Sequence, residues 1–214
     1  MAMLLNSNSF KGKYSSPIGE SREFRKFGEF WRKKNKIALA LVFLLIIFGV
    51  MSRFLPHAWN FTPITALALF ISAYFGARYF LVAVPAILFI SDLFIGFYQW
   101  QIMIAVYGSF MLAGMVGCLI KSKKSAGLIF VSAIGSSLVF FLVTNWAVWQ
   151  FGAMYEHSFA GLIQSYIMAL PFFRNSLVGD LFYAGVFFGG FEVVRYLALS
   201  LKSRARHSAL SFWI

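Results

Sequence analysis

Long apolar stretches dominate this sequence and limit its fold more than any other feature. Hydrophobic residues make up 60% of the 214 positions and charged residues only 12%, whereas about a quarter of the residues in a soluble domain are charged. A soluble protein of this size needs more polar side chains to cover its surface. Most of the apolar stretches are long enough to cross the ~30 Å hydrocarbon core of a bilayer as helices. The sequence therefore predicts an all-α integral membrane protein.

Six transmembrane helices are predicted between residues 37 and 200. The second and third are short, so a re-entrant or tilted second segment is an alternative. Residues 160–170 are predicted to form a separate interfacial helix, which Pro171 ends. The six predicted spans are 37–52, 63–75, 80–95, 102–120, 127–149 and 177–199.

The distribution of Lys and Arg predicts the orientation of these helices. With the N-terminus inside, seventeen of the nineteen basic residues lie on the inner side, and only Arg53 and Arg174 lie outside. Both termini are therefore predicted to be cytoplasmic. Residues 1–36 form a basic, partly amphipathic tail facing the anionic inner leaflet, and residues 201–214 form a second basic tail. This placement accounts for the net charge of +12 without a nucleic-acid partner.

Under this topology, the polar side chains that are unusual in membrane spans gather at the outer face. Such residues are costly in lipid and mark functional sites. We expect them to form an outward-facing pocket that captures a small molecule. A structural alternative is that Asp92 pairs with Arg53 or Arg174 to hold two helix ends together. The residues predicted to bind the small molecule are Arg53, His57, Asn60, Asp92, Asn145, Trp146, Arg174, Asn175 and Asp180.

Sequence signatures of enzymes and metal sites are missing. The chain has no metalloprotease, nucleophile-elbow, Walker or Cys-x-x-Cys motif. Its single cysteine, Cys118, excludes an internal disulfide and a multi-cysteine metal site. The spacing of His57 and His157 matches no standard metal motif. We expect no enzymatic activity, no cofactor and no bound metal, and a membrane-embedded enzyme using Asp92, His57 or Glu156 ranks last.

Four segments resemble a family of uncharacterised small bacterial multi-pass membrane proteins. These segments are residues 53–64, 91–96, 144–149 and 171–175. That family is loosely similar to the substrate-binding (S) components of energy-coupling factor vitamin transporters in size, helix number and outward site. The resemblance implies a protein of the bacterial inner membrane that captures a vitamin or a related micronutrient. It also implies an energising transmembrane partner with ATPases.

A non-catalytic structural or assembly subunit of a larger membrane complex is the main alternative. Pairs of small residues four apart, at 113 and 117, 133 and 137, and 185 and 189, are suited to close helix contacts. This alternative predicts that the outer polar residues pair with one another and enclose no cavity. Glu192 and Arg195 are expected to pair on one helix face.

Overall fold

The protein is an all-helical, multi-pass membrane protein. The computed structural model describes residues 17–55, 60–197 and 200–201, with side chains from Asn35 onward. The chain divides into two units, Met1–Leu41 and Val42–Ile214, and the second contains the helical bundle. Among the described residues every regular element is helical, and six are α-helices. Five helices are long and apolar enough to cross a membrane.

Helix α1 (Pro17–Ser52) is one continuous helix of 36 residues. It begins earlier than the predicted first span, because proline is well suited to a first helical turn and nothing after it ends the helix. The predicted basic tail is therefore helical from Pro17 onward. Within the second unit, a Cβ at Gly49 would lie 2.8 Å from Ile87 Cδ1, so this glycine permits a close contact with the next long helix.

The long helices α3 (Ala77–Ile95), α4 (Trp100–Leu119) and α5 (Ala126–Phe151) agree with the predicted spans to within a few residues. Their ends follow from local chemistry. Gly96 ends α3 with a φ of 110°, which favours glycine. Ser125 caps α5 by accepting a hydrogen bond from the Leu128 amide at 3.3 Å. The short 3₁₀ turn η1 (Ile120–Ser122) extends α4 toward the lysine-rich connection.

Helix α6 (Phe159–Ala184) differs from the prediction, because Pro171 lies inside it and does not end it. It continues through a π-helical turn, η2 (Gly185–Gly189), to Leu197, so the whole helix has 39 residues. Proline is tolerated in membrane helices, where neighbouring groups satisfy the released backbone carbonyl. The predicted interfacial helix and the predicted sixth span are thus two parts of one helix.

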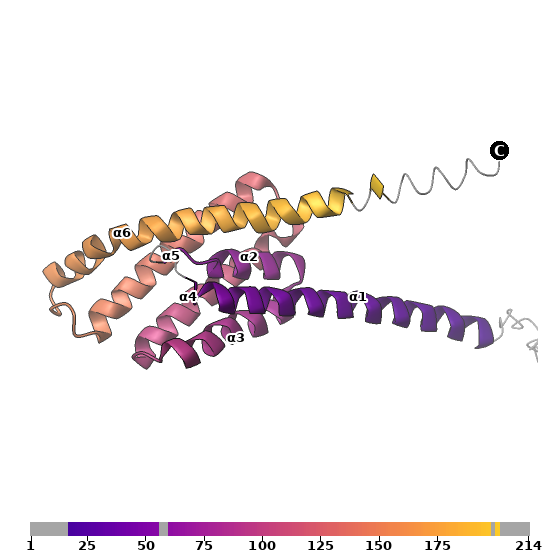
Figure 1. Ribbon diagram of the computed structural model, residues 1–214, viewed down its shortest axis with the longest axis horizontal. Helices are drawn as coiled ribbons and strands as arrows, with labels where there is room; N and C mark the ends of the chain where they lie inside the picture. Colours follow the sequence, from indigo (N-terminus) through magenta and orange to yellow (C-terminus); the bar gives the residue numbers. More distant parts are fainter. Residues whose placement is uncertain (1–16, 56–59, 198–199, 202–214) are drawn as a thin grey trace, which may run out of the picture. The chain divides into compact units, whose positions relative to one another are not determined.

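Helix α2 (Ile64–Tyr74) has only 11 residues, which is about 16 Å and half of a hydrocarbon core. Its residues from Ile64 to Ala73 are all buried. Figure 1 shows this short helix among the longer α3, α4, α5 and α6. A helix that is apolar on every side belongs inside a bundle, which explains why α2 packs against all four of these helices.

An irregular segment before α2 completes the second passage through the bundle. Asn60 has a φ of 62°, and the ring of the next residue, Phe61, lies 5.5 Å from the ring of Tyr183 near the end of α6. At the other end of α2, Gly76 turns the chain with a φ of 97°, and Lys121 of η1 lies beside this turn. The described residues thus contain five helices that could cross a membrane and the shorter apolar helix α2.

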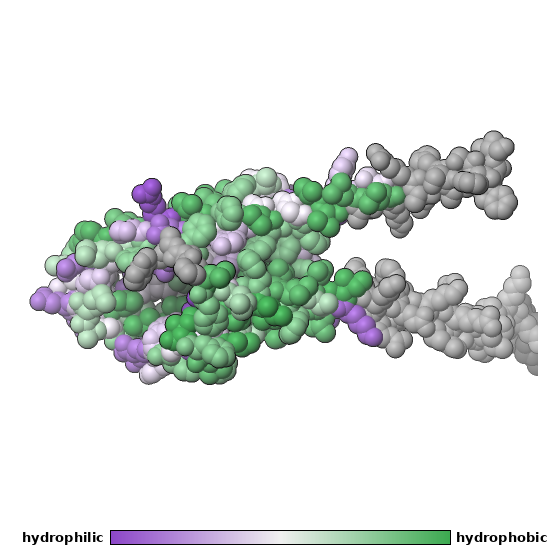
Figure 2. Space-filling view, viewed as in Figure 1, coloured by the Kyte–Doolittle hydropathy of each residue, from purple (hydrophilic) through white to green (hydrophobic). Residues whose placement is uncertain are grey.

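Glycines in α4 allow the close packing that holds α2 and α3. A Cβ at Gly117 would meet the Ser72 hydroxyl and the Leu69 carbonyl of α2. A Cβ at Gly114 would meet the ring of Phe80 in α3. Figure 2 shows apolar side chains along the flank of the bundle, with polar side chains concentrated toward the end that carries the connection between α5 and α6.

Candidate functional site

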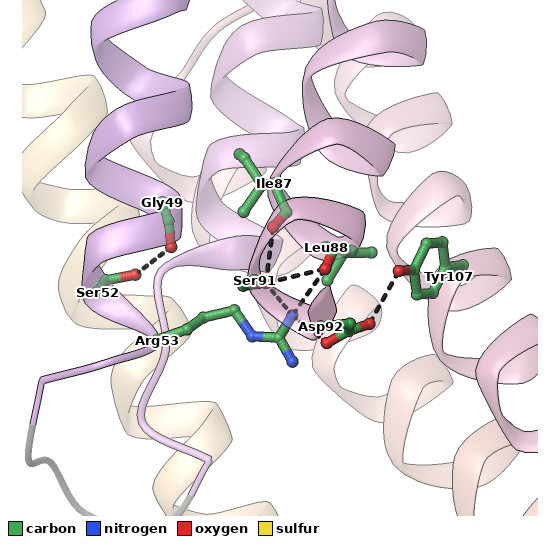
Figure 3. A network of polar contacts seen from close by, with 8 residues as sticks. All are labelled: Gly49, Ser52, Arg53, Ile87, Leu88, Ser91, Asp92 and Tyr107. Atoms are coloured by element: carbon green, nitrogen blue, oxygen red, sulfur yellow. Dashed lines mark hydrogen bonds and ion pairs between the residues drawn. The ribbon is translucent and has the colours of Figure 1, made fainter. Parts of the chain in front are cut away.

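Two buried aspartates organise the polar interior of the bundle, and the first is Asp92 on α3. Its Oδ1 lies 2.8 Å from Arg53 Nη1, just after α1, as an ion pair without a well-aligned hydrogen bond. Tyr107 of α4 donates to its Oδ2 at 2.8 Å. Arg53 Nη1 also donates to Ser91 Oγ at 2.5 Å. Figure 3 shows this network joining α3, α4 and the end of α1.

The network around Asp92 is closed and electrically balanced. The Asp92 side chain is 1% exposed and that of Arg53 is 19% exposed. A buried charge is stable only when it is paired and its remaining polar atoms have partners. Arg53 supplies the opposite charge and Tyr107 supplies a hydroxyl. The predicted pairing of Asp92 with Arg53 is therefore confirmed.

The second aspartate, Asp180 on α6, has a different set of partners. It is 3% exposed. Ser137 of α5 donates a hydrogen bond to its Oδ2 at 2.5 Å, and the side chain of Thr65 in the first turn of α2 interacts with the same carboxylate. Ser137 and Asp180 lie near the middle of α5 and α6. The carboxylate therefore sits deep in the bundle at the start of the short helix.

We call Asp92 with Arg53 and Tyr107 the first cluster, and Asp180 with Ser137 and Thr65 the second cluster. A cavity of about 220 Å³ lies between them. The beginning of α2 faces it, and no described side chain caps that helix end. Its lining combines six polar residues with a mainly aromatic and aliphatic wall. The polar residues are Arg53, Asn60, Thr62, Thr65, Ser176 and Asp180, and the others are Ile64, Leu88, Tyr98, Val106, Phe110 and Phe140.

Tyr98, in the connection between α3 and α4, forms part of the cavity wall. Burial, with a smaller contribution from the negative charge of Asp92, raises the pKa of Tyr98 to about 12. The phenol therefore keeps its proton at neutral pH. It offers the cavity an uncharged ring and a hydroxyl donor.

A second cavity of about 210 Å³ adjoins the first and shares Asn60, Phe140 and Ser176 with it. Its other walls come from α5 and α6. They are Phe141, Thr144, Asn145, Val148, Ala169, Phe172 and Phe173. The first cavity is polar around Asp180, and the walls of the second are more aromatic.

Some of the predicted site residues meet at these cavities. Arg53, Asn60 and Asp180 line the first, and Asn60 and Asn145 line the second. Asp92 lies behind the first cavity in its ion pair with Arg53. Asp180 does not lie at the end of a span as predicted, because the continuous helix of 39 residues from Phe159 to Leu197 places it near the middle.

Other predicted residues lie elsewhere. Arg174 and Asn175, expected in an outer loop, are helical residues of α6 and are not among the residues lining the two cavities. Trp146 lies along an apolar groove with Phe151 and is 45% exposed. His57 lies outside the described residues.

Sequence reasoning missed the hydroxyl partners of the second cluster. Ser137 was predicted only as a small residue for helix packing, and Thr65 and Ser176 were not selected. A usable signal was present, since hydroxyl side chains inside apolar spans often form hydrogen bonds between helices. The lining aromatic residues Tyr98, Phe110 and Phe140 carry no such signal, because 27 phenylalanines are spread along the chain.

Comparison with known proteins identifies a family but adds no function. No curated protein and no solved structure matches the chain. A family model does match residues 33–203, which include all helices from α2 to α6. By this match, the chain belongs to DUF6580, a family of unknown function.

Proposed function

We propose that this protein is a membrane transport protein that captures a small molecule in the cavity beside the start of α2. One observation carries the proposal: a cavity of about 220 Å³ beside the start of α2 is lined by Arg53, Asn60 and the buried Asp180. Polar and charged groups at membrane depth are costly and mark substrate or ion pathways.

The interrupted second passage supports the same proposal. Non-helical backbone at membrane depth is tolerated where it is enclosed by protein or lines a cavity. Asn60 and Thr62 belong to such a segment, and both line the cavity. In transporters, substrate sites form near the bilayer midplane where helices are interrupted. The short α2 and the non-helical residues 60–63 before it are similar to such an interrupted helix.

The direction of transport is proposed to be uptake. The strong excess of Lys and Arg in the tails and in the connection at residues 121–124 favours cytoplasmic termini in a bacterial inner membrane. The cavity then receives its ligand from the outer side, as in S components of energy-coupling factor transporters. A vitamin-like micronutrient and an energising partner with ATPases are parts of this proposal.

A thermal-shift screen of the purified full-length protein in detergent tests ligand capture. The screen covers vitamins, their precursors and other metabolites of every charge class. A ligand present at 100 times its dissociation constant adds about 2.7 kcal/mol to the free energy of unfolding. The same ligand is expected to bind more weakly to an Asn60→Gly variant, which removes a lining side chain and tolerates the φ of 62°.

Leu119→Ala is the matched control for this screen, because Leu119 is 80% exposed and does not line either cavity. Its ligand response should equal that of the native chain. A well-folded protein that responds to no compound in the screen contradicts the capture proposal.

A second candidate function, as a subunit of a larger membrane complex, is favoured by a groove on the outside of α4 and α5. This groove encloses about 330 Å³ and is lined by small residues that include Ala113, Gly135 and Ser136. Ser136 Oγ is buried there and makes no hydrogen bond in the described part of the chain. A helix of another protein could donate to it. Purification in mild detergent, comparing the native chain with Gly135→Leu, tests for a stably bound partner.

A further inference from the structure

The charges around the larger polar cavity do not balance. Two charged side chains, Arg53 and Asp180, line it. Arg53 is already engaged, because its Nη1 lies 2.8 Å from Asp92 Oδ1. Among the described residues, Asp180 has no comparable cation beside it. Counted over Arg53, Asp92 and Asp180, the described residues at and behind this lining carry one more carboxylate than cations.

The partners of Asp180 stabilise its position but do not neutralise it. Ser137 donates a hydrogen bond at 2.5 Å, and Thr65 adds a second hydroxyl contact. Hydroxyl groups donate hydrogen bonds to the carboxylate oxygens, but they carry no net charge. A carboxylate that is 3% exposed and lacks a cation is costly in a low-dielectric interior. A positively charged ligand would remove this cost.

Aromatic rings form the wall of the cavity near this carboxylate. Phe110 and Phe140 lie face to face at an angle, with ring centroids 4.8 Å apart, and both line the cavity together with Tyr98. The faces of such rings attract cations, especially weakly hydrated organic ones. A carboxylate combined with aromatic walls is the arrangement that recognises an ammonium group. The lining also offers hydroxyl and amide oxygens, so an inorganic cation is the competing occupant that the test below separates.

The size and continuation of the space restrict the ligand further. The volume of about 220 Å³ is below the range of roughly 300–1,000 Å³ typical of drug-sized ligands. The adjoining cavity of about 210 Å³ has aromatic walls from Phe141, Phe172 and Phe173. A ligand that spans both would have a small charged head and a flat or apolar remainder.

We propose that the cavity binds a small organic cation, an amine or a quaternary ammonium compound, with its charged nitrogen beside Asp180. The uncharged part of the ligand extends between Phe141, Phe172 and Phe173. This assignment rests on the proposed capture function and names its substrate class.

The test compares probes that differ mainly in charge, using the full-length protein in detergent at pH 7. The cations are 2-phenylethylamine and choline, the neutral analogue is 2-phenylethanol, and the anion is 3-phenylpropanoate. Melting temperature and isothermal titration report binding. At least one cation is expected to stabilise the protein and to bind on the order of tenfold or more tightly than the neutral and anionic analogues.

Asp180→Asn removes the charge while retaining the size of the side chain. It should weaken cation binding on the order of tenfold or more. Glu192→Gln is the matched control, because it removes one acidic charge from an exposed position of the same long helix, where Glu192 pairs with Arg195. Its binding should be unchanged. If Asp180→Asn does not fold, Phe140→Leu provides a second test, since it removes an aromatic face without altering the carboxylate.

Three outcomes overturn the assignment. Stabilisation by neutral or anionic compounds, with no response to either cation, leaves the capture proposal standing and removes the cation class. Stabilisation by NaCl over choline chloride at equal ionic strength assigns Asp180 to an inorganic ion. Equal cation binding by the native protein, Asp180→Asn and Phe140→Leu places the cation elsewhere. The capture proposal itself fails only when the broad metabolite screen also finds no ligand.

Discussion

Asp92 and Asp180 are the same residue type at nearly the same burial, 1% and 3% exposed, yet their surroundings differ in kind. Asp92 has Arg53 at 2.8 Å and a tyrosine hydroxyl, so its charge is balanced within the protein. The described partners of Asp180 are the hydroxyls of Ser137 and Thr65, and a cavity adjoins it. The first cluster connects helix ends, whereas the second lies at the start of an interrupted helix.

This contrast shows why burial alone does not identify a functional carboxylate. A residue that holds helices together has its counter-charge built into the fold. In the function proposed above, Asp180 lacks a counter-charge among the described residues, and a ligand in the adjoining cavity would supply it. Charged residues inside membranes are therefore best compared by the counter-charges beside them. The predictions that follow use the unliganded protein to measure this difference.

The largest effect is expected for Asp92→Asn, which leaves the half-buried Arg53 without its counter-charge. Removing one partner of a buried ion pair lowers the free energy of unfolding by about 3–5 kcal/mol. Unfolding of the variant in mixed detergent micelles with increasing SDS measures the change. The double variant Arg53→Met with Asp92→Leu should recover most of the loss. A loss below about 1 kcal/mol in the single variant contradicts a structural role for this pair.

A somewhat smaller effect is expected for Gly117→Ala. The added Cβ meets the Ser72 hydroxyl and the backbone of Leu69, so α2 must move. Overpacking of this kind costs about 1–3 kcal/mol. Gly185→Ala is the control, because a Cβ there has no neighbour within 4 Å among the described residues. Equal unfolding curves for the two variants would contradict the close packing of α4 against α2 at Gly117.

Ser137→Ala tests the hydrogen bond inside the second cluster. Loss of the hydroxyl donor to Asp180 should lower the free energy of unfolding by about 1 kcal/mol. Ser109→Ala is a comparable control, because the Ser109 hydroxyl donates only to the backbone carbonyl of Ala105. A loss at Ser137 no larger than at Ser109 would mean that Ser137 does not stabilise the carboxylate.

The smallest loss of stability is expected for Asp180→Asn in the absence of ligand. Because the substitution removes a buried charge that has no cation beside it among the described residues, it should leave the free energy of unfolding unchanged or raise it. The matched substitution at Asp92 should instead lower it. If both substitutions cost the same in the same SDS titration, the distinction between the two aspartates is wrong.

Much of the fold was predictable because its signals are local. The predicted spans at 80–95, 102–120 and 127–149 match α3, α4 and α5, since glycines, lysines and a serine cap mark their ends. The pairing of Glu192 with Arg195, at 3.1 Å, follows from helical spacing. The ion pair of Arg53 with Asp92 was among the alternatives weighed from the sequence.

The rest depended on packing between distant segments. Pro171 resembles a helix end in the sequence, but a membrane bundle accommodates it within α6. That continuous helix places Asp180 near its middle, not at the end of a span as predicted. Ser137 is 43 residues from Asp180, so no local pattern connects them. The short α2 at Ile64–Tyr74, by contrast, agrees with the predicted segment at 63–75.

The burial of α2 has a consequence for how any cargo crosses the membrane. One end of α2 forms a wall of the cavity, and its other end turns at Gly76 beside Lys121. Between these ends, residues Ile64 to Ala73 are enclosed by the bundle. In the conformation that the described residues adopt, α2 is thus a plug between the cavity and that end of the bundle. Under the transport function proposed above, passage would require α2 to move, and a gating step of the protein would then set the rate of turnover.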